Sequence, residues 1–274
     1  MRLRIAHSSI YRYDPPAAGV IQVLRLTPRN HEGQHIGHWR IDVTPDARLA
    51  AHEDAFGNIS HVFTADGPLD ELRVEVDGEV ETQNANGVVR GTVERFPPSL
   101  FLRDTTLTQA DNAIRDFAQK TRDAGGGVVL AELHGLLDRL FEDIAGDSAS
   151  GGAAASSAPA KNAAEAFARK HGAAADLAHI FIGAARSLGI PARYVRGYFR
   201  HPDKSADTDT SHAWAEAHVP DLGWVGFDPS DGRCPTDSHV RVAIGLDSLG
   251  AAAVRGTRLG VGAETLAVAI KVDQ

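Results

Sequence analysis

The residues with the clearest chemical potential lie between Gly172 and Asp231. His212 opens one expected strand and Asp228 closes the next, sixteen residues later. Antiparallel pairing of the two strands would set an imidazole beside a carboxylate. Such a carboxylate holds the tautomer of the histidine and supports its imidazolium, as in a nucleophile–His–Asp triad. A His–Asp pair is also a common structural element, so it predicts a catalytic site only if a nucleophile accompanies it.

A helix is predicted over residues 174–188, and its first turn is where a catalytic thiol would be expected. Gly189 follows at the position of a left-handed C-cap, and Pro191 prevents continuation. The dipole and the free N–H groups of a helix N-terminus lower the pKa of a thiol there. The start of this helix contains no cysteine, however. Cys234, the one cysteine of the chain, lies in a predicted loop after Asp228, where we expect an incidental thiol.

Four motifs of this segment, in the same order and with the same spacing, resemble those of bacterial transglutaminase-like proteins. The sequence Gly-Ala-Ala-Ala-Asp-Leu-Ala-His at residues 172–179 resembles the family motif Gly-x-Cys-x-Asp-Phe-Ala-His. The segment after this motif, the histidine motif and the aspartate motif are matched by residues 187–195, 211–216 and 223–229. The first 95 residues look like the β domain that often precedes this core, so the resemblance covers nearly the whole chain.

The resemblance implies a papain-like Cys–His–Asp site that acts on amide bonds of a peptide or protein. His212 would be the general base and Asp228 its orienting partner. The thiol would attack the carbonyl, release an amine and leave a thioester for water or a second amine to resolve, while N–H groups at the helix start stabilise the oxyanion. Hydrolysis is favoured, because nothing visible secures an amine acceptor over water. Trp214, on the same strand face as His212, is either a wall of the substrate cleft or a core aromatic.

The chain departs from the family at the nucleophile. Gly172 and Asp176 flank this position, which assigns it to Ala174. A methyl group cannot attack a carbonyl, so we expect the chain to lack covalent turnover. Two explanations stay open: an engineered Cys-to-Ala variant, or a natural pseudoenzyme that serves as a peptide- or protein-binding module. The engineered variant is favoured, because every other matched motif position looks intact.

Hydrophobic periodicity predicts an α+β fold in two parts. An N-terminal antiparallel β domain, a small sandwich of short alternating strands, is expected over residues 1–95. Residues 96–274 are expected to form a transglutaminase-like, papain-type core closed by C-terminal strands at 240–244 and 266–270. Its central strands are predicted at residues 192–199, 212–219 and 224–227. The Gly-, Ala- and Ser-rich residues 146–160 are expected to be a mobile loop within this core.

The composition is that of a folded chain and narrows the classes of function. A formal net charge of −8 argues against a general nucleic-acid or anionic-membrane binder, and no apolar run approaches the ~20 residues of a membrane span. The start of the chain lacks the apolar stretch of a signal peptide, so a cytoplasmic location is expected. His31, His35 and His38 cluster without a carboxylate or thiol to complete a metal site, so no metal or other cofactor is expected.

Overall fold

A computed structural model describes residues 1–146, 160–201 and 211–274 of the chain. Within these residues lie an antiparallel sheet of six strands, a second antiparallel sheet of five strands, and four α-helices beside the second sheet. The predicted α+β class is confirmed. The loop predicted at residues 146–160 lies almost entirely outside the described residues. In the described segments, no helix is long and apolar enough to cross a membrane.

The six-stranded sheet is built on two long strands, β1 (Arg2–Thr27) and β4 (Ile59–Thr82). They run antiparallel over nearly their whole lengths, beginning where Arg2 lies opposite Glu81. Alternate residues of β1 are buried, which is the period-two pattern that makes these segments strands with one face in the core. The remaining strands are β2 (Gln34–Thr44), β3 (Ala50–Glu53), β12 (Val254–Leu259) and β13 (Ala263–Asp273).

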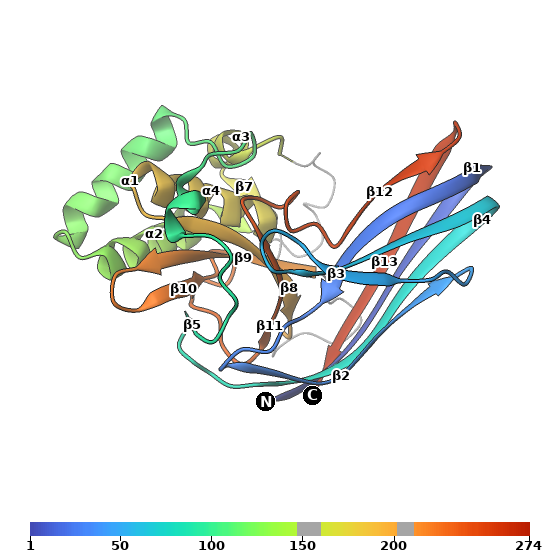
Figure 1. The fold of residues 1–274 in the computed structure, drawn as a ribbon. Coiled ribbons are helices and arrows are strands. Elements are labelled where there is room, and N and C mark those ends of the chain that lie inside the picture. Colours follow the sequence, from blue (N-terminus) through green and yellow to red (C-terminus); the bar gives the residue numbers. More distant parts are fainter. Residues whose placement is uncertain (147–159, 202–210) are drawn as a thin grey trace.

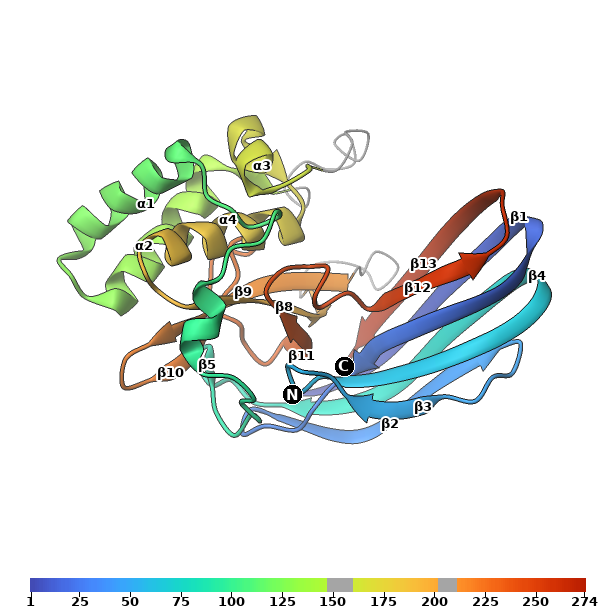
Figure 2. The same cartoon turned by 45° about the horizontal axis from the view of Figure 1, so that its top comes forward.

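This sheet folds back on itself in the middle of β1 and β4. The first half of β1 pairs with β13 and the second half with β12, and the register of β1 against β4 shifts on either side of Ala17. Figures 1 and 2 show both long strands doubling back at the end remote from the helices. At the bend, a Cβ on Gly67 would lie 2.2 Å from the carbonyl oxygen of Ala17, so the backbones meet only with glycine there. Tyr11 and Phe63, from opposite halves, share one buried cluster, so one folded sheet supplies the layers that the sequence predicts as a sandwich.

The second sheet has the strand order β11–β8–β9–β10–β5 and carries the helices. Its strands are β5 (Val88–Val89), β8 (Ala192–Phe199), β9 (Ser211–Val219), β10 (Gly223–Phe227) and β11 (His239–Gly245). The helices are α1 (Asn112–Gly125), α2 (Val129–Asp143), α3 (Ala163–Arg169) and α4 (Ala174–Ser187), preceded by the 3-10 helix η1 (Pro98–Leu102). Strands β6 (Ala145–Gly146) and β7 (His171–Gly172) form a short parallel pair.

Strand β9 lies between two different environments. Helix α4 packs against β8 and β9, and its Phe181 stacks on Phe227 of β10 with 5.1 Å between ring centroids. Ala213 and Ala215 of β9 belong to the same buried cluster as the α4 side chains. Because successive residues of a strand point to opposite faces, the even-numbered residues of β9, beginning with His212, project from the other face.

The strand pairing differs from the predicted division into residues 1–95 and 96–274. The sequence assigns β12 and β13 to the core, but both pair with β1 of the first sheet. It assigns β5 to the N-terminal domain, but β5 pairs with β10 of the second sheet. The reason is that β4 covers one edge of β1, and the other edge would expose unpaired N–H and C=O groups without β12 and β13.

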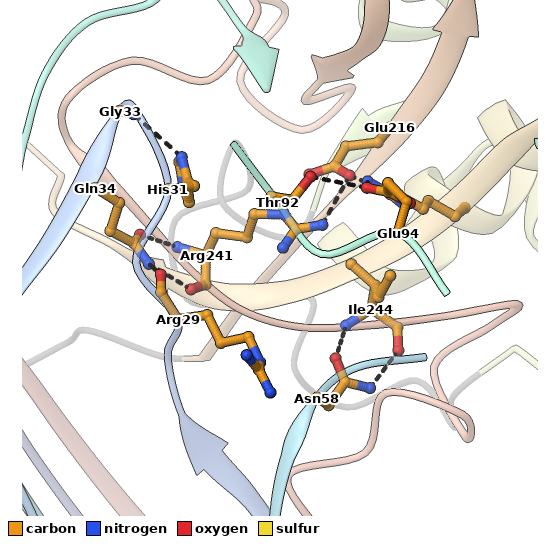
Figure 3. A network of polar contacts seen from close by, with 11 residues as sticks. Arg29, His31, Gly33, Gln34, Asn58, Thr92, Glu94, Glu216, Arg241 and Ile244 are labelled. Carbon is orange, nitrogen blue, oxygen red and sulfur yellow. Dashed lines mark hydrogen bonds and ion pairs between the residues drawn. The ribbon is translucent and has the colours of Figure 1, made fainter. Parts of the chain in front are cut away.

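Two amide side chains of the first domain cover the free edge of the second sheet, as Figure 3 shows. Strand β11 is the edge strand of that sheet. Gln34 donates to the carbonyl of Arg241 at 2.9 Å and accepts from its N–H at 2.8 Å. Asn58 does the same with Ile244, at 2.8 Å for both bonds. Each amide therefore replaces one residue of a missing neighbouring strand, and the two fix β11 to the first domain.

Replacement of Asn58 by alanine is expected to lower the free energy of unfolding by about 2 kcal/mol or more, because it leaves the N–H and C=O of Ile244 unpaired in a buried junction. Asn84, which is exposed and accepts a hydrogen bond from the N–H of Asn86, offers the matched control, and Asn84→Ala is expected to change stability by less than about 0.5 kcal/mol. Urea denaturation of both variants measures the difference. Equal stabilities would contradict the role given to Asn58.

Candidate active site

His212, the second residue of β9, and Asp228, the residue after β10, lie side by side. Nε2 of His212 is 2.5 Å from Oδ2 of Asp228. Both side chains are buried, that of Asp228 completely. The antiparallel pairing of β9 with β10 brings them together, as the strand pattern predicts. Because Nε2 is used on the carboxylate, Nδ1 is the ring nitrogen that remains for a reacting group.

The carboxylate of Asp228 is surrounded by hydrogen-bond donors. His212 and His239 reach Oδ2 through their Nε2 atoms at 2.5 and 3.2 Å. Ser230 donates to Oδ1 through its N–H at 3.0 Å and its hydroxyl at 2.7 Å. Burial alone would raise the pKa of Asp228, but the two imidazoles overcome this and hold it well below its usual range. The site therefore contains a fixed, ionised carboxylate.

His239 is a member of the site that the sequence reasoning does not identify. It begins β11 and is 5% exposed. Its Nδ1 accepts a hydrogen bond from the backbone N–H of Thr236 at 3.1 Å, while its Nε2 faces Asp228. The one sequence signal was a histidine directly before the predicted strand at 240–244. Nothing local shows that this strand lies at the edge of the sheet, next to the end of β8.

His212, Asp228 and His239 form a group that could hold a metal ion, since one ligand atom from each lies within 4.8 Å of the others. Two imidazoles and one carboxylate suit zinc or iron. A histidine that binds a metal through Nε2 must carry its proton on Nδ1. In His239, the N–H of Thr236 points at Nδ1 and excludes a proton there. The hydrogen bonds of His239 therefore match a donor to Asp228 better than a ligand of a metal ion.

A second buried carboxylate, Glu216, lies four residues beyond His212 on the same face of β9. Arg241 brings its Nε to within 2.7 Å of one oxygen of Glu216 (Figure 3). Arg193 brings its Nε to within 2.7 Å of the other oxygen and also binds Glu94. Burial raises the pKa of Glu216, but the two guanidinium groups more than compensate and bring it to about 2. The face of the sheet that carries the candidate site therefore holds two ionised carboxylates.

Position 174 is the first residue of α4, as predicted. The carboxylate of Asp176 accepts a hydrogen bond from the N–H of Ala173 at 3.1 Å and closes the first turn of the helix. The methyl group of Ala174 packs against the hydrophobic core. A hydrogen bond joins His212 to Asp228, whereas Ala174 packs on the cluster that contains Ala213 and Ala215 of β9, so its place beside His212 stays a prediction. A side chain at this position lies at the positive end of the helix dipole.

Trp214, the candidate substrate-binding residue, is 2% exposed. Its ring lies 6.2 Å from that of His212, and it belongs to a buried cluster with Phe101 and Trp224. It also borders a cavity of about 50 Å³ together with His239. This burial matches the core-aromatic alternative, and a contact with substrate stays a prediction.

Cys234 lies in the loop after the candidate site, as predicted, beside a surface cavity of about 420 Å³. Burial, together with the nearby carboxylate of Asp138, raises the pKa of its thiol to about 11. A nucleophilic cysteine needs the opposite shift, because the thiolate is the reactive form. The surroundings of Cys234 therefore do not suit it to replace a nucleophile at position 174.

Comparison with known proteins finds two matches along the chain. Residues 3–81 match the bacterial transglutaminase-like N-terminal region, and residues 133–229 match the transglutaminase-like superfamily. The second match includes Ala174, His212 and Asp228. An uncharacterized protein of Mycobacterium leprae (strain TN) is 27% identical over 293 residues, which cover 100% of this chain and 99% of the relative. An uncharacterized protein of Mycobacterium tuberculosis (strain H37Rv) is 25% identical and covers 99% and 92%.

A solved structure shares the fold of the whole chain. It is the crystal structure of a Cytophaga hutchinsonii protein named as "a Putative Cysteine Protease". The two structures superpose with a TM-score of 0.73 over 100% of this chain and 90% of the other, at 19% sequence identity. The arrangement of two sheets with helices beside the second is therefore also present in a solved structure.

Replacement of Glu216 by glutamine is expected to lower the free energy of unfolding at pH 7 by about 3 kcal/mol, because it leaves two guanidinium groups without their buried partner. The pKa of Glu216 is about 2 in the folded chain and about 4.3 in an unfolded one. Its contribution is therefore complete above that unfolded value and is lost as the pH falls toward 2.

The difference in the free energy of unfolding between the parent and Glu216→Gln, measured by chemical denaturation, should accordingly decrease from pH 5 to pH 2. Glu71, which is partly exposed and pairs with Arg12 and Arg73 at the surface, provides the control. Glu71→Gln is expected to cost less than about 1 kcal/mol at every pH. A difference in the free energy of unfolding between the parent and Glu216→Gln that stays constant with pH would contradict the assigned pKa.

The thiol of Cys234 is expected to react with iodoacetamide at pH 8 roughly 100-fold more slowly than N-acetylcysteine, because a pKa of about 11 leaves little thiolate. Mass spectrometry of timed samples gives the rate. Unfolding in guanidinium chloride should restore the rate of a free thiol. A fast reaction in the folded chain would show that the thiol is more acidic than its surroundings indicate.

Proposed function

Because the chain belongs to the transglutaminase-like superfamily, we propose that it is a cysteine hydrolase or acyltransferase scaffold for amide bonds of peptides or proteins, lacking its nucleophile at Ala174. The observation that carries the proposal is the buried pair of His212 and Asp228, 2.5 Å apart. The pair has the geometry of a general base with an orienting carboxylate. The chain with alanine at position 174 cannot form a covalent intermediate.

With a thiol at position 174, each step follows from these groups. Nδ1 of His212 takes the proton of the thiol, and the thiolate attacks the carbonyl carbon of the amide. The imidazolium, supported by Asp228, then gives its proton to the nitrogen as the C–N bond breaks, which releases the amine and leaves a thioester. Water, deprotonated by His212, hydrolyses the thioester and regenerates the thiol. N–H groups of the first turn of α4 stabilise the oxyanion in both stages.

The alternative is a natural pseudoenzyme that binds a peptide or protein without turnover. Ala174 itself favours this alternative, because position 174 offers no thiol or hydroxyl to acylate. The His212–Asp228 pair favours the enzyme scaffold, since a binding module has no need for a buried ionised carboxylate behind an imidazole. Hydrolysis over amine transfer, a cytoplasmic location, and the lack of nucleic-acid and membrane partners stay predictions.

Replacement of Ala174 by cysteine, in a Cys234→Ser background, is expected to create a reactive thiol with a pKa of about 7 or lower, because the helix N-terminus and His212 both favour the thiolate. The pH dependence of iodoacetamide alkylation measures this pKa. Ala175→Cys is the matched control: it lies in the same helical turn but about 100° around the axis, so it senses the dipole without facing His212.

Three results decide the proposal. Addition of His212→Ala to Ala174→Cys should raise the thiol pKa toward 8.5, and equal pKa values for the cysteines at 174 and 175 would contradict the triad. Ala174→Cys should cleave amides in a broad peptide panel or incorporate a primary amine. A reactive thiol without either activity, in a folded chain, would favour the binding module.

A further inference from the structure

The candidate site holds a second imidazole that the proposed reaction does not use. We infer that His239 is a positioning residue, which holds Asp228 in the orientation that His212 requires by donating a hydrogen bond to the same carboxylate oxygen. The inference rests on the proposed function and adds a residue to it. Three features of the molecule support it: the tautomer of His239, the four hydrogen bonds to the carboxylate of Asp228, and the packing of both imidazole rings on Phe199.

The tautomer of His239 follows from its neighbour in the preceding turn. The backbone N–H of Thr236 can only donate, and it lies 3.1 Å from Nδ1 of His239, so Nδ1 must be the acceptor nitrogen. The neutral ring then carries its proton on Nε2. That nitrogen lies 3.2 Å from Oδ2 of Asp228, so His239 donates to the carboxylate. The N–H of His239 also bonds to the carbonyl of Thr236 at 3.2 Å, which closes the turn and fixes the ring.

The donors around Asp228 leave its carboxylate no freedom to rotate. A carboxylate has about four acceptor positions. Ser230 uses two on Oδ1, and His212 and His239 use the others on Oδ2. Without His239, Oδ2 would keep His212 as its one donor, and Asp228 could turn about its Cβ–Cγ bond. The orientation of His212 would then be less well defined.

An aromatic side chain holds the two imidazoles in place. Phe199, at the end of β8, has its ring centroid 4.3 Å from that of His239 and 4.9 Å from that of His212, tilted by about 30° to each. Trp214 meets His239 edge-on, with 5.4 Å between centroids. Asp228 is completely buried, so the hydrogen bonds to its carboxylate act in a medium of low dielectric.

The first test uses the chain as it stands, with Ala174, and so does not depend on activity. In ¹⁵N-labelled protein, His239 should show an unprotonated Nδ1 and a slowly exchanging Nε2–H, and His239→Leu should speed solvent exchange of the Nε2–H of His212. A proton on Nδ1 of His239 would overturn the inference. So would stoichiometric Zn²⁺ binding, by calorimetry, that His239→Leu abolishes, because His239 would then be a metal ligand.

The second test adds two variants to Ala174→Cys/Cys234→Ser. His239→Gln keeps a side-chain N–H donor, and His239→Leu has a similar size without one. His239→Leu should slow alkylation of Cys at position 174 about 10-fold or more at pH 6, where the thiolate depends on its pairing with His212, and leave the rate at pH 10 unchanged. His239→Gln should restore most of the rate at pH 6.

These outcomes separate the inference from the proposed function. A loss of rate at pH 6 and pH 10 alike, or a loss that glutamine does not restore, would make His239 a structural residue only. An unchanged rate in His239→Leu, with the dependence on His212 intact, would overturn the inference and leave the triad standing. An alkylation rate that His212→Ala does not change would instead overturn the proposed function, and the tautomer of His239 would still be decided by the first test.

Discussion

A carboxylate removed from water stays ionised only if donors surround it, and the second sheet buries two carboxylates on one face. Glu216 is held by two arginines, and Asp228 by two histidines and a serine. Glu216 is bound by Arg193 of β8 and by Arg241 of β11. Asp228 is bound by His212 of β9 and by His239 of β11. Each carboxylate therefore has one donor from β11. The position of β11 therefore decides whether either charge is stable.

The first domain controls that position. Strand β11 is an edge strand, and the amides of Gln34 and Asn58 occupy its free hydrogen-bonding groups at Arg241 and Ile244. The same contacts that protect an edge from unwanted pairing thus fix the donors of both buried carboxylates. This dependence links the folded first sheet, which is remote from the candidate site, to the strand that carries a donor to each buried carboxylate. It also gives the N-terminal region a physical role beyond covering the core.

In the proposed function, Ala174 stands where the nucleophile is expected, while the hydrogen bonds around Asp228 are complete. Electrostatic preorganisation is costly to build, because every buried donor and acceptor must be paired. In this chain, Asp228 retains four donors although no covalent chemistry can begin at Ala174. For this reason, the substitution of cysteine at position 174 is an informative test of the proposed function.

The sequence determined what depends on neighbouring residues. It predicted β8 at residues 192–199 to the residue and α4 from Ala174, because periodicity and the Gly189 stop signal are local. It predicted that His212 and Asp228 meet, because one turn joins their strands. Only the tertiary structure decided that β12 and β13 join β1, and that His239 is the second donor to Asp228. These pairings join segments that are far apart in the sequence, and no local pattern identifies their partners. Strand edges and charged side chains become buried only when the whole chain has packed.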